Sequence, residues 1–421
     1  MNFLVVTNAP TFYKNKKNSA YAPYVKEMDI WFSKVENFGI ISPGSYPEKI
    51  FTKDFERQDL RFFKIPFLQF NNIFKIFAAL IYSPYLLFVF ITAFIWADHI
   101  HLRCPGNIGL IGCIVQIFFP KKPKSVKYAG NWDPKAKQPW SYRLQKKILN
   151  NPQLSKNIKV LVYGEWENQS ENVIPFFTAS FTENDKELVQ KNFISPYKFI
   201  FVGTLNSGKR PIFAIKMIEN LLKNQIPVKL EMYGEGVIKK EIIDYIKINN
   251  LEPFVQLMGN EVLENLKNVY KSAHFLILAS KSEGWPKAIA EAMFFGCIPI
   301  STNVSCVPWM LGYPPPDSYG DQKGGAMNVR ITNRGILIPD DEFNKDEAGE
   351  NSQYFREKTV ESLIELIRDT DKLKKMSSEA QKWSQQYTLE RFDEAIKDIL
   401  ASNYDINKKS SSFFGRGGGV G

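Results

Sequence analysis

The stretch from Ala273 to Thr302 constrains the fold most, because it contains the pattern of a strand, a short loop, a helix and a second strand. The apolar run 275–279 predicts the first strand, and the composition predicts a helix that begins at Pro286 and stops at Gly296. A second apolar run, 297–300, follows directly, so the connection has the length of a parallel βαβ crossover. The loop before the helix should then lie at the carboxyl edge of a parallel sheet, where open α/β folds bind ligands.

Two glutamates within this stretch indicate the kind of ligand. Glu283 lies in the loop and Glu291 lies about two turns further along, so a close catalytic pair is not expected. A carboxylate in the loop can accept hydrogen bonds from hydroxyl groups, and the free amides and positive dipole at the helix start attract phosphate. Hydroxyls together with phosphates favour a nucleotide sugar; the alternative is an ordinary surface loop with solvated glutamates.

The same residues resemble a known family. Ser-Glu-Gly-Trp-Pro at 282–286, the spacing of Glu283 and Glu291, and the run 291–293 followed by Gly296 and Pro299 resemble the E-x7-E signature of family 4-type retaining glycosyltransferases. The resemblance implies an α/β chain with the GT-B fold, in which two Rossmann-like domains face a cleft and a C-terminal helix crosses back to the first domain. It also implies metal-independent transfer, without any cofactor, from a nucleoside diphosphate sugar.

The resemblance further implies roles for single residues. Glu283 and Lys209 would be catalytic, with Glu283 gripping sugar hydroxyls and Lys209 holding the donor diphosphate, while Glu291 would bind the ribose. Thr204 stands where the family has an arginine, and we expect Arg210 to supply part of the missing charge, although an arginine and a lysine are not equivalent. The remaining positions expected to bind the donor are Gly203, Gly234, Gly236, Gly259, Asn260, Gly284, Trp285, Pro286, Lys287 and Ala288.

In the first half, the residues 98–101 read Asp-His-Ile-His, and strand alternation places both histidines on one face. This stretch resembles the Asp-x-x-His-x-His strand end of many relatives, which implies that one histidine contacts the donor sugar or the acceptor; we favour His101 as the catalytic one. A core histidine is the alternative. The residues expected on the acceptor side are Arg103, Asn131 and Trp132. A metal site is not expected, because no third ligand follows within reach.

The length of 421 residues suits two α/β domains. We expect an acceptor-side domain over 1–190, a nucleotide-sugar domain over 191–387, a helix over 388–408 that packs on the first domain, and a disordered tail over 409–421. The strand predicted at 159–163 should be the last of the first half.

The basic charge is concentrated in the first half of the chain. Residues 1–195 contain 25 Lys and Arg against 15 Asp and Glu, whereas the remainder contains 29 of each, so the first half holds the whole net charge of +10. Most of the excess lies between Lys121 and Lys147, interleaved with Trp and Tyr. This pattern favours an anionic inner-membrane surface. Nucleic acid is not expected, because no recognition module accompanies the charge; a solvated basic face is the alternative.

The run from Ile76 to Trp96 contains 21 residues without a charge. Pro84 and two tyrosines interrupt it, so a buried helix is favoured over an interfacial helix, and both over a membrane span. The N-terminus lacks the features of a signal peptide. Four cysteines without a CxxC pair are interpreted as reduced, buried thiols of a cytosolic protein.

The sequence therefore predicts a cytoplasmic glycosyltransferase, of hexosyltransferase type (EC 2.4), peripheral on the cytoplasmic face of the membrane. It would transfer sugar, with retention, to a lipid-linked or polysaccharide acceptor in bacterial cell-surface polysaccharide biosynthesis. The alternatives are a nucleotide-sugar-binding or scaffold protein without turnover, and a sugar-nucleotide epimerase of related fold.

Overall fold

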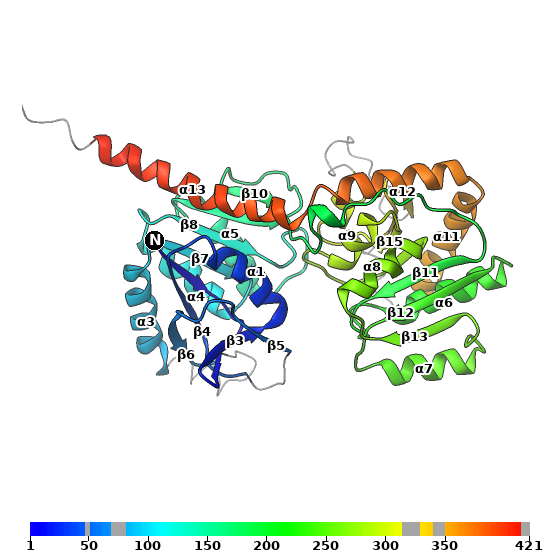
Figure 1. Cartoon of the computed structure of the whole chain (residues 1–421), viewed down its shortest axis with the longest axis horizontal. Coiled ribbons are helices and arrows are strands. Elements are labelled where there is room, and N and C mark those ends of the chain that lie inside the picture. Colours follow the sequence, from blue (N-terminus) through cyan, green and yellow to red (C-terminus); the bar gives the residue numbers. More distant parts are fainter. Residues whose placement is uncertain (47–50, 69–80, 314–328, 340–349, 414–421) are drawn as a thin grey trace, which may run out of the picture. The chain divides into compact units, whose positions relative to one another are not determined.

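The computed structural model describes residues 1–46, 51–68, 81–313, 329–339 and 350–413. The chain divides into two compact units, each built on its own parallel sheet (Figure 1). The first unit comprises residues 1–163, 167–176 and 392 onward, and the second comprises 164–166 and 177–391.

The first unit contains a seven-stranded parallel sheet in the order β10-β9-β8-β7-β1-β4-β6. Its strands are β1 (Asn2–Val6), β4 (Asn37–Pro43), β6 (Arg61–Ile65), β7 (His99–Cys104), β8 (Lys124–Tyr128), β9 (Ile158–Tyr163) and β10 (Val173–Phe176). The prediction that β9 is the last strand of this half was wrong. The segment between β9 and β10 is polar, but β10 pairs with β9 and extends the sheet.

A smaller antiparallel sheet and several helices complete this unit. The elements are β2 (Phe12–Lys14), β3 (Lys17–Tyr21), β5 (Thr52–Asp54), α1 (Ala22–Phe32), α3 (Ser83–Trp96), α4 (Asn107–Val115), η1 (Gln116–Phe118), α5 (Trp140–Leu149) and most of α13 (Leu389–Phe413). Tyr24, Met28 and Trp31 form a stripe along α1 that is buried in the core. Helix α13 continues to Phe413, so residues 409–413 of the expected tail are helical, and 414–421 lie outside the described residues.

The C-terminal part of the charge-free run forms helix α3. Residues 76–80 of the run lie outside the described part. One side of α3, with Leu86, Phe90, Ala93 and Phe94, is buried against the unit. Of the helices that the structure describes, none is long and apolar enough to cross a bilayer.

The second unit contains a seven-stranded sheet in the order β13-β12-β11-β14-β15-β17-β16, parallel except for β16. Its strands are β11 (Tyr197–Val202), β12 (Val228–Tyr233), β13 (Val255–Gly259), β14 (Phe275–Leu278), β15 (Ile298–Thr302), β16 (Arg330–Ile331) and β17 (Ile336–Ile338). Its helices are η2 (Glu183–Asp185), α6 (Pro211–Lys223), α7 (Lys239–Ile248), α8 (Leu263–Ser272), α9 (Lys287–Phe294), α10 (Val307–Met310), α11 (Glu350–Ile367) and α12 (Thr370–Ser384). The predicted βαβ unit is confirmed as β14–α9–β15, and Asp369 caps α12 by accepting from the amide of Lys372.

The two histidines of β7 lie on one face of the strand, as predicted, and that face is inside the core. His99 Nε2 and His101 Nδ1 each lie 2.8 Å from the hydroxyl oxygen of Ser125 on β8. Burial, with a contribution from nearby cations, lowers the pKa of His99 to about 3 and lowers the pKa of His101 well below its ordinary value. Both imidazoles are therefore neutral in the folded chain.

These histidines should make stability depend on pH. Because the folded pKa is depressed, unfolding takes up protons below about pH 6.5, so the stability is complete above that pH and is lost as pH falls toward 3. For His99 alone the loss between pH 7 and pH 5 is about 2 kcal/mol. His99→Gln, which keeps a polar group near Ser125, should remove that part of the pH dependence in urea titrations at the two pH values. An equal loss in both proteins would contradict this account.

Candidate functional site

The strand order of the second sheet reverses between β11 and β14. From β11 the chain proceeds outward to β12 and β13, whereas from β14 it proceeds the other way to β15. In open α/β sheets such a switch point leaves a crevice beyond the carboxyl ends of the two strands. The loops 203–210 and 279–286 follow these strands, so both border the crevice position.

Lys209 and Glu283, from these two loops, form an ion pair. The Lys209 ammonium donates to Glu283 Oε1, and the carboxylate side chain is 9% exposed while the lysine side chain is 28% exposed. The backbone supports this meeting: the amide of Lys281 donates to the carbonyl of Gly208 (2.9 Å), and the amide of Lys209 donates to the side-chain oxygen of Asn206 (3.0 Å). The structure thus brings together the two residues predicted to be catalytic in this unit. Sequence reasoning missed Asn206, although an Asn-Ser-Gly turn is a signal for such a loop.

The glycines after β12 are needed for contact between neighbouring loops. A Cβ on Gly234, whose φ is +144°, would lie 2.0 Å from the carbonyl oxygen of Gly203, and a Cβ on Gly236 would lie 2.2 Å from that of Leu205. The amides of Gly203 and Leu205 in turn donate to the carbonyls of Tyr233 and Glu235. The family resemblance assigned these glycines to close approach by a nucleotide; the structure shows that they admit the loop that carries Lys209. Donor binding by Gly203, Gly234 and Gly236 stays a prediction.

Helix α9 begins directly after the loop that holds Glu283. Pro286 is its N-cap, and the first amides of the helix, at Lys287 and Ala288, have no partner within a helical ladder. The carbonyl of Gly284 accepts hydrogen bonds from the Ser305 hydroxyl and the Cys306 thiol, both at 3.2 Å, which fixes the approach to the helix. The helix start is therefore positioned to present amides at the carboxyl edge of the sheet.

Trp285, predicted to bind the donor, has its side chain in the core instead. It is 7% exposed and packs against the rings of Trp309, Trp383 and Tyr387. An aromatic residue here anchors the loop by burying its large apolar surface. The prediction of direct donor contact by this side chain is corrected to an anchoring role.

Arg210 is also largely buried. It has a left-handed backbone conformation, with φ of +49°, and its Nη1 donates to the carbonyl of Ala279 at the end of β14. This bond links the loop after β11 to the neighbouring strand. Thr204, which stands where the family has an arginine, is exposed. The expectation that Arg210 contributes charge to the donor site stays a prediction.

Glu291 accepts hydrogen bonds from two side chains of the protein. The hydroxyls of Ser180 and Tyr270 donate to its two carboxylate oxygens at 2.6 and 2.9 Å. Burial, followed by this carboxylate, raises the pKa of Tyr270 well above its ordinary value. Glu291 thus ties α9 to α8 and to the segment before β11. Ribose binding by Glu291 stays a prediction, and neither hydroxyl partner carried a sequence signal.

The turn after β13 is held close to the turn after β12. Gly259 has a φ of +76°, and its carbonyl accepts from the amide of Gly234 at 2.7 Å. Asn260 follows it at the carboxyl end of the strand. This location fits the expected contact with the donor base, which stays a prediction for both residues.

In the first unit, the structure corrects the role of His101. Its side chain is fully buried, lies 4.5 Å from the Trp31 ring between centroids, and shares the hydroxyl of Ser125 with His99. A side chain enclosed in this way contacts neither donor nor acceptor. The alternation along the strand correctly predicted that both histidines share one face. It could not predict that α1 covers that face, because this depends on tertiary packing.

The residues predicted for the acceptor side are engaged within the protein. Arg103 forms an ion pair with Glu27, which also pairs with Lys127 at 3.0 Å, and these two cations hold the pKa of that carboxyl far below its usual range despite the opposing effect of burial. Trp132 is 1% exposed. Asn131 accepts the amide of Asp133 with its side chain at 2.8 Å. The structure therefore corrects Trp132 to a core residue, and acceptor contact by Arg103 and Asn131 stays a prediction.

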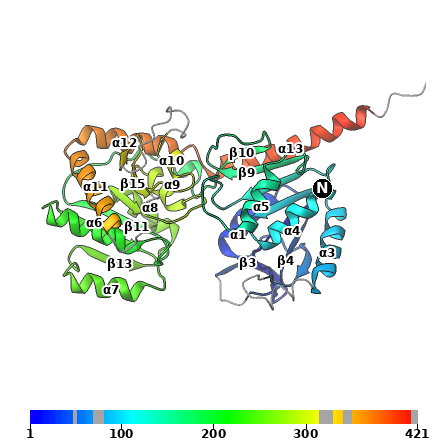
Figure 2. The same ribbon diagram turned by 180° about the vertical axis from the view of Figure 1, so that it is seen from behind.

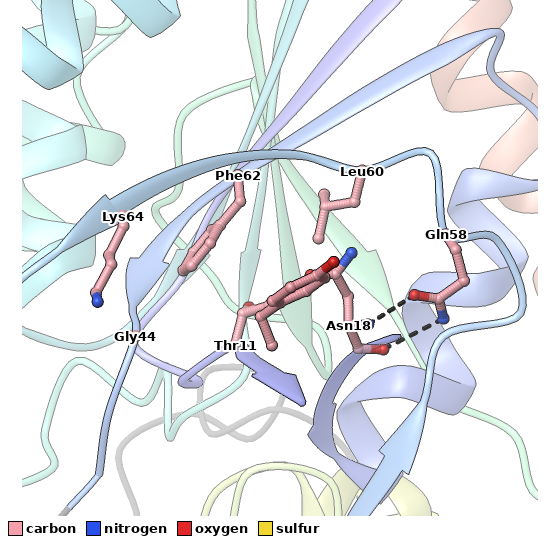
Figure 3. A pocket seen from close by; sticks show the side chains of 8 residues that line it. Thr11, Asn18, Gly44, Gln58, Leu60, Phe62 and Lys64 are labelled. Atoms are coloured by element: carbon pink, nitrogen blue, oxygen red, sulfur yellow. Dashed lines mark hydrogen bonds between the residues drawn. The ribbon is translucent and has the colours of Figure 1, made fainter. Parts of the chain in front are cut away.

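A cavity of about 570 Å³ in the first unit lies elsewhere, beside the small sheet (Figure 3). Phe62 and Leu60 point into it, and Lys64 lies at one end (Figure 3). Asn18 and Gln58 are hydrogen-bonded to one another on the other side. The residues that line the cavity are Thr11, Tyr13, Asn18, Gly44, Gln58, Leu60, Phe62 and Lys64. Sequence reasoning missed all of them, because they come from separate strands and loops without a motif.

Within the described residues, no group of three or more His, Cys, Asp or Glu side chains is arranged to hold a metal ion.

The candidate site lies inside a stretch that resembles a known family. Residues 184–312, within the second unit, match the model described as "Glycosyl transferases group 1". A GalNAc-alpha-(1->4)-GalNAc-alpha-(1->3)-diNAcBac-PP-undecaprenol alpha-1,4-N-acetyl-D-galactosaminyltransferase of Campylobacter jejuni is 33% identical over 175 residues, which cover 40% of this chain and 43% of that protein. An N-acetylgalactosamine-N,N'-diacetylbacillosaminyl-diphospho-undecaprenol 4-alpha-N-acetylgalactosaminyltransferase of the same organism is 30% identical over 183 residues, covering 41% of this chain and 45% of that protein. The matches span less than half the length of these curated relatives.

Solved structures similar to this chain show the fold. Anabaena Alr3699/HepE, in complex with UDP-glucose, matches with a TM-score of 0.60 at 14% identity, covering 96% of this chain and all of that one. Sucrose-phosphate synthase from Thermosynechococcus elongatus matches with a TM-score of 0.60 at 13% identity and the same coverage. The predicted α/β architecture of GT-B type is confirmed by these folds, and residues 184–312 of the second unit are similar to group 1 glycosyl transferases.

Gly236→Ala should displace the loop that holds Lys209. The added methyl group would meet the backbone of Leu205 at 2.2 Å, so the free energy of unfolding should fall by about 1–3 kcal/mol. Gly203→Ala is the matched control, because a Cβ there meets only side-chain atoms at 3.8 Å or more. Urea unfolding of both variants measures the difference. Equal stability of the two would show that the loops are not packed as described.

Proposed function

We propose that this chain is a retaining glycosyltransferase that transfers a sugar from a nucleoside diphosphate sugar to a lipid-linked or polysaccharide acceptor in bacterial cell-surface polysaccharide biosynthesis. The observation that carries the proposal is the Lys209–Glu283 pair, which lies at the switch point of the sheet and inside the residues that match the family model. A cation beside a hydroxyl-accepting carboxylate suits a ligand that carries both a diphosphate and a sugar.

The chemistry would depend on charge stabilisation by Lys209 and by the start of α9. The bond between the sugar and the diphosphate oxygen would break as the sugar carbon bonds to an acceptor hydroxyl oxygen, and the hydroxyl proton would pass to the departing diphosphate. Negative charge grows on that diphosphate as the bond breaks. The Lys209 ammonium and the amides of Lys287 and Ala288 would stabilise that charge, while Glu283 would accept hydrogen bonds from sugar hydroxyls. Lys209 and Glu283 neutralise one another in their ion pair. Donor binding would replace that pair with a contact from Lys209 to the diphosphate and contacts from Glu283 to the sugar hydroxyls. The proposed transfer uses no metal ion and no cofactor.

The acceptor would bind in the first unit, and the cavity beside the small sheet is the site we propose for it. Tyr13 and Phe62 offer ring faces on which a sugar can pack, and the Lys64 ammonium offers a partner for a phosphate. Both Campylobacter relatives are named for acceptors that are sugars on an undecaprenol diphosphate. A lipid-linked acceptor of this general chemistry would need both kinds of contact.

A lipid-linked acceptor requires access to the membrane, so we propose that the chain is peripheral on the cytoplasmic face of an anionic membrane. The basic run 121–147 contributes less than its sequence suggested. Lys124 donates to main-chain carbonyls inside the unit, and Lys127 pairs with Glu27, so both are buried. The exposed basic residues of the run are Lys121, Lys135, Lys137, Arg143 and Lys147.

A nucleotide-sugar-binding protein without turnover is the second candidate. It is favoured by Thr204, which lacks the charge that the family's arginine gives to the diphosphate. The rival enzyme is an epimerase of related fold. Adding an acceptor would not increase its release of nucleoside diphosphate, because it transfers no sugar.

One experiment separates these candidates. The purified chain is incubated with UDP-, GDP- and ADP-sugars, with or without membrane lipid extract, and the release of nucleoside diphosphate is followed. A transferase should release nucleoside diphosphate from one of the nucleotide sugars, and the release should be faster when the lipid extract that contains the acceptor is present. Binding by calorimetry without release would favour the second candidate, and absence of both would refute the proposed function.

Lys209→Ala should reduce turnover at least tenfold, because the negative charge that grows on the departing diphosphate would no longer be stabilised by the ammonium. Initial rates of diphosphate release at saturating donor measure the effect. Lys223→Ala is the control, since that side chain is 67% exposed and pairs with Glu219 on its own helix. An unchanged rate in Lys209→Ala would remove this lysine from the mechanism.

A further inference from the structure

Helix α3 has an apolar outer side that the described part of its own unit does not cover. The helix lies at the margin of the first unit in both views (Figures 1 and 2). Its buried side contacts β6, β1 and α4. On the other side Leu87, Phe88 and Ile95 are 51%, 66% and 63% exposed. The exposed apolar residues of this outer face are Tyr85, Leu87, Phe88, Ile91 and Ile95.

The polar groups on the outer face are satisfied by nearby main chain. The Thr92 hydroxyl donates to the carbonyls of Phe88 and Val89 on its own helix, at 2.8 and 3.0 Å. The Tyr85 hydroxyl donates to the carbonyl of Lys64 at 2.9 Å. A helix that faces water normally carries charged and polar side chains on that side. This face carries no charge over 14 residues, so its chemistry suits contact with a nonaqueous surface.

Cations border the outer face at both ends. At the C-terminal end, Arg61 stacks on the Trp96 ring at 5.1 Å, and the Lys122 ammonium donates to the carbonyls of Ile95 and Ala97. Lys121 is exposed beside it, and Lys64 lies near the N-terminal end through its contact with Tyr85. The neighbouring acid, Asp98, accepts the backbone amide of Asn2. An apolar strip with a basic border complements anionic lipid headgroups above acyl chains.

We propose that the outer face of α3 is the membrane-docking surface of this chain and lies in the plane of an anionic bilayer. A helix of 14 residues is about 21 Å long, shorter than the hydrocarbon core of about 30 Å, so it lies along the boundary and does not cross. Leu87, Phe88, Ile91 and Ile95 enter the acyl boundary. Arg61, Lys64, Lys121 and Lys122 meet the phosphate groups.

The surface has a direct relation to the proposed acceptor cavity. Lys64 belongs to both, because its side chain lines the cavity and its carbonyl accepts from Tyr85 of α3. Docking through α3 therefore brings the cavity next to the headgroup layer, where the sugar and diphosphate of a lipid-linked acceptor are found. The proposed function supplies the reason why the chain would need a bilayer, and in that respect this inference rests on it. The docking of α3 to lipid is argued from the outer face alone.

The test is flotation of the purified full chain with vesicles. Wild type should float with vesicles of 30% phosphatidylglycerol in phosphatidylcholine, less with pure phosphatidylcholine, and less at 0.5 M salt. Phe88→Glu/Ile95→Glu should reduce the bound fraction at least tenfold. Val237→Glu/Ile248→Glu is the matched control, because it places the same two charges on exposed apolar positions of the second unit, which are 90% and 78% exposed. That control should float like wild type.

Two further measurements keep the outcome decisive. Thermal unfolding, together with UDP binding by calorimetry, should be alike in wild type and both variants, so that loss of flotation is not loss of folding. Failure of wild type to float, or equal flotation of Phe88→Glu/Ile95→Glu, overturns the proposal. If wild type instead forms a dimer that this variant abolishes, the face is an interface between two copies, which also overturns it. Each of these results leaves the donor chemistry untouched, which is judged by diphosphate release.

Discussion

The site depends on the meeting of two opposite charges across the strand-order reversal of the second sheet. Lys209 and Glu283 are 74 residues apart in sequence, and their loops meet because β11 and β14 are neighbours whose chains then continue in opposite directions. The pair is only partly exposed, so each charge stabilises the other where water is limited. A donor that supplies a diphosphate to the lysine and hydroxyls to the carboxylate can replace that stabilisation without leaving either charge alone.

Much of the second unit could be predicted from sequence because its signals are local. Proline marks the start of α9 and glycine follows its end, and short apolar runs mark β14 and β15, so these elements and their loop follow from patterns within about ten residues. Lys209 and Glu283 were found for the same reason, since each lies in a loop between a strand and a helix. Their contact with each other needed the sheet order, which no local pattern contains.

The errors have a common physical cause, which is burial by distant segments. Trp285 follows the loop glycine in the sequence, but α12 and its following turn cover it with Trp383 and Tyr387. His101 has the alternation of an accessible strand, yet α1 covers it with Trp31. The cavity beside the small sheet was missed for the converse reason. Its lining is assembled from β2, β3, β6 and neighbouring loops, none of which has an unusual composition.

The first unit is assembled from both ends of the chain. Phe392, at the start of the part of α13 that belongs to this unit, packs on Phe176 and lies over the ammonium of Lys127, and Asp393 pairs with Lys34 at 2.6 Å. During synthesis on the ribosome, the strands of this unit emerge before α13, so their core becomes complete only after the whole second unit has been made. Until then Lys127 has its carboxylate partner but lacks one of the rings that shield it. A truncated product that ends before residue 392 would thus leave Phe176 and Lys127 without this ring, even though its entire first sheet has been translated.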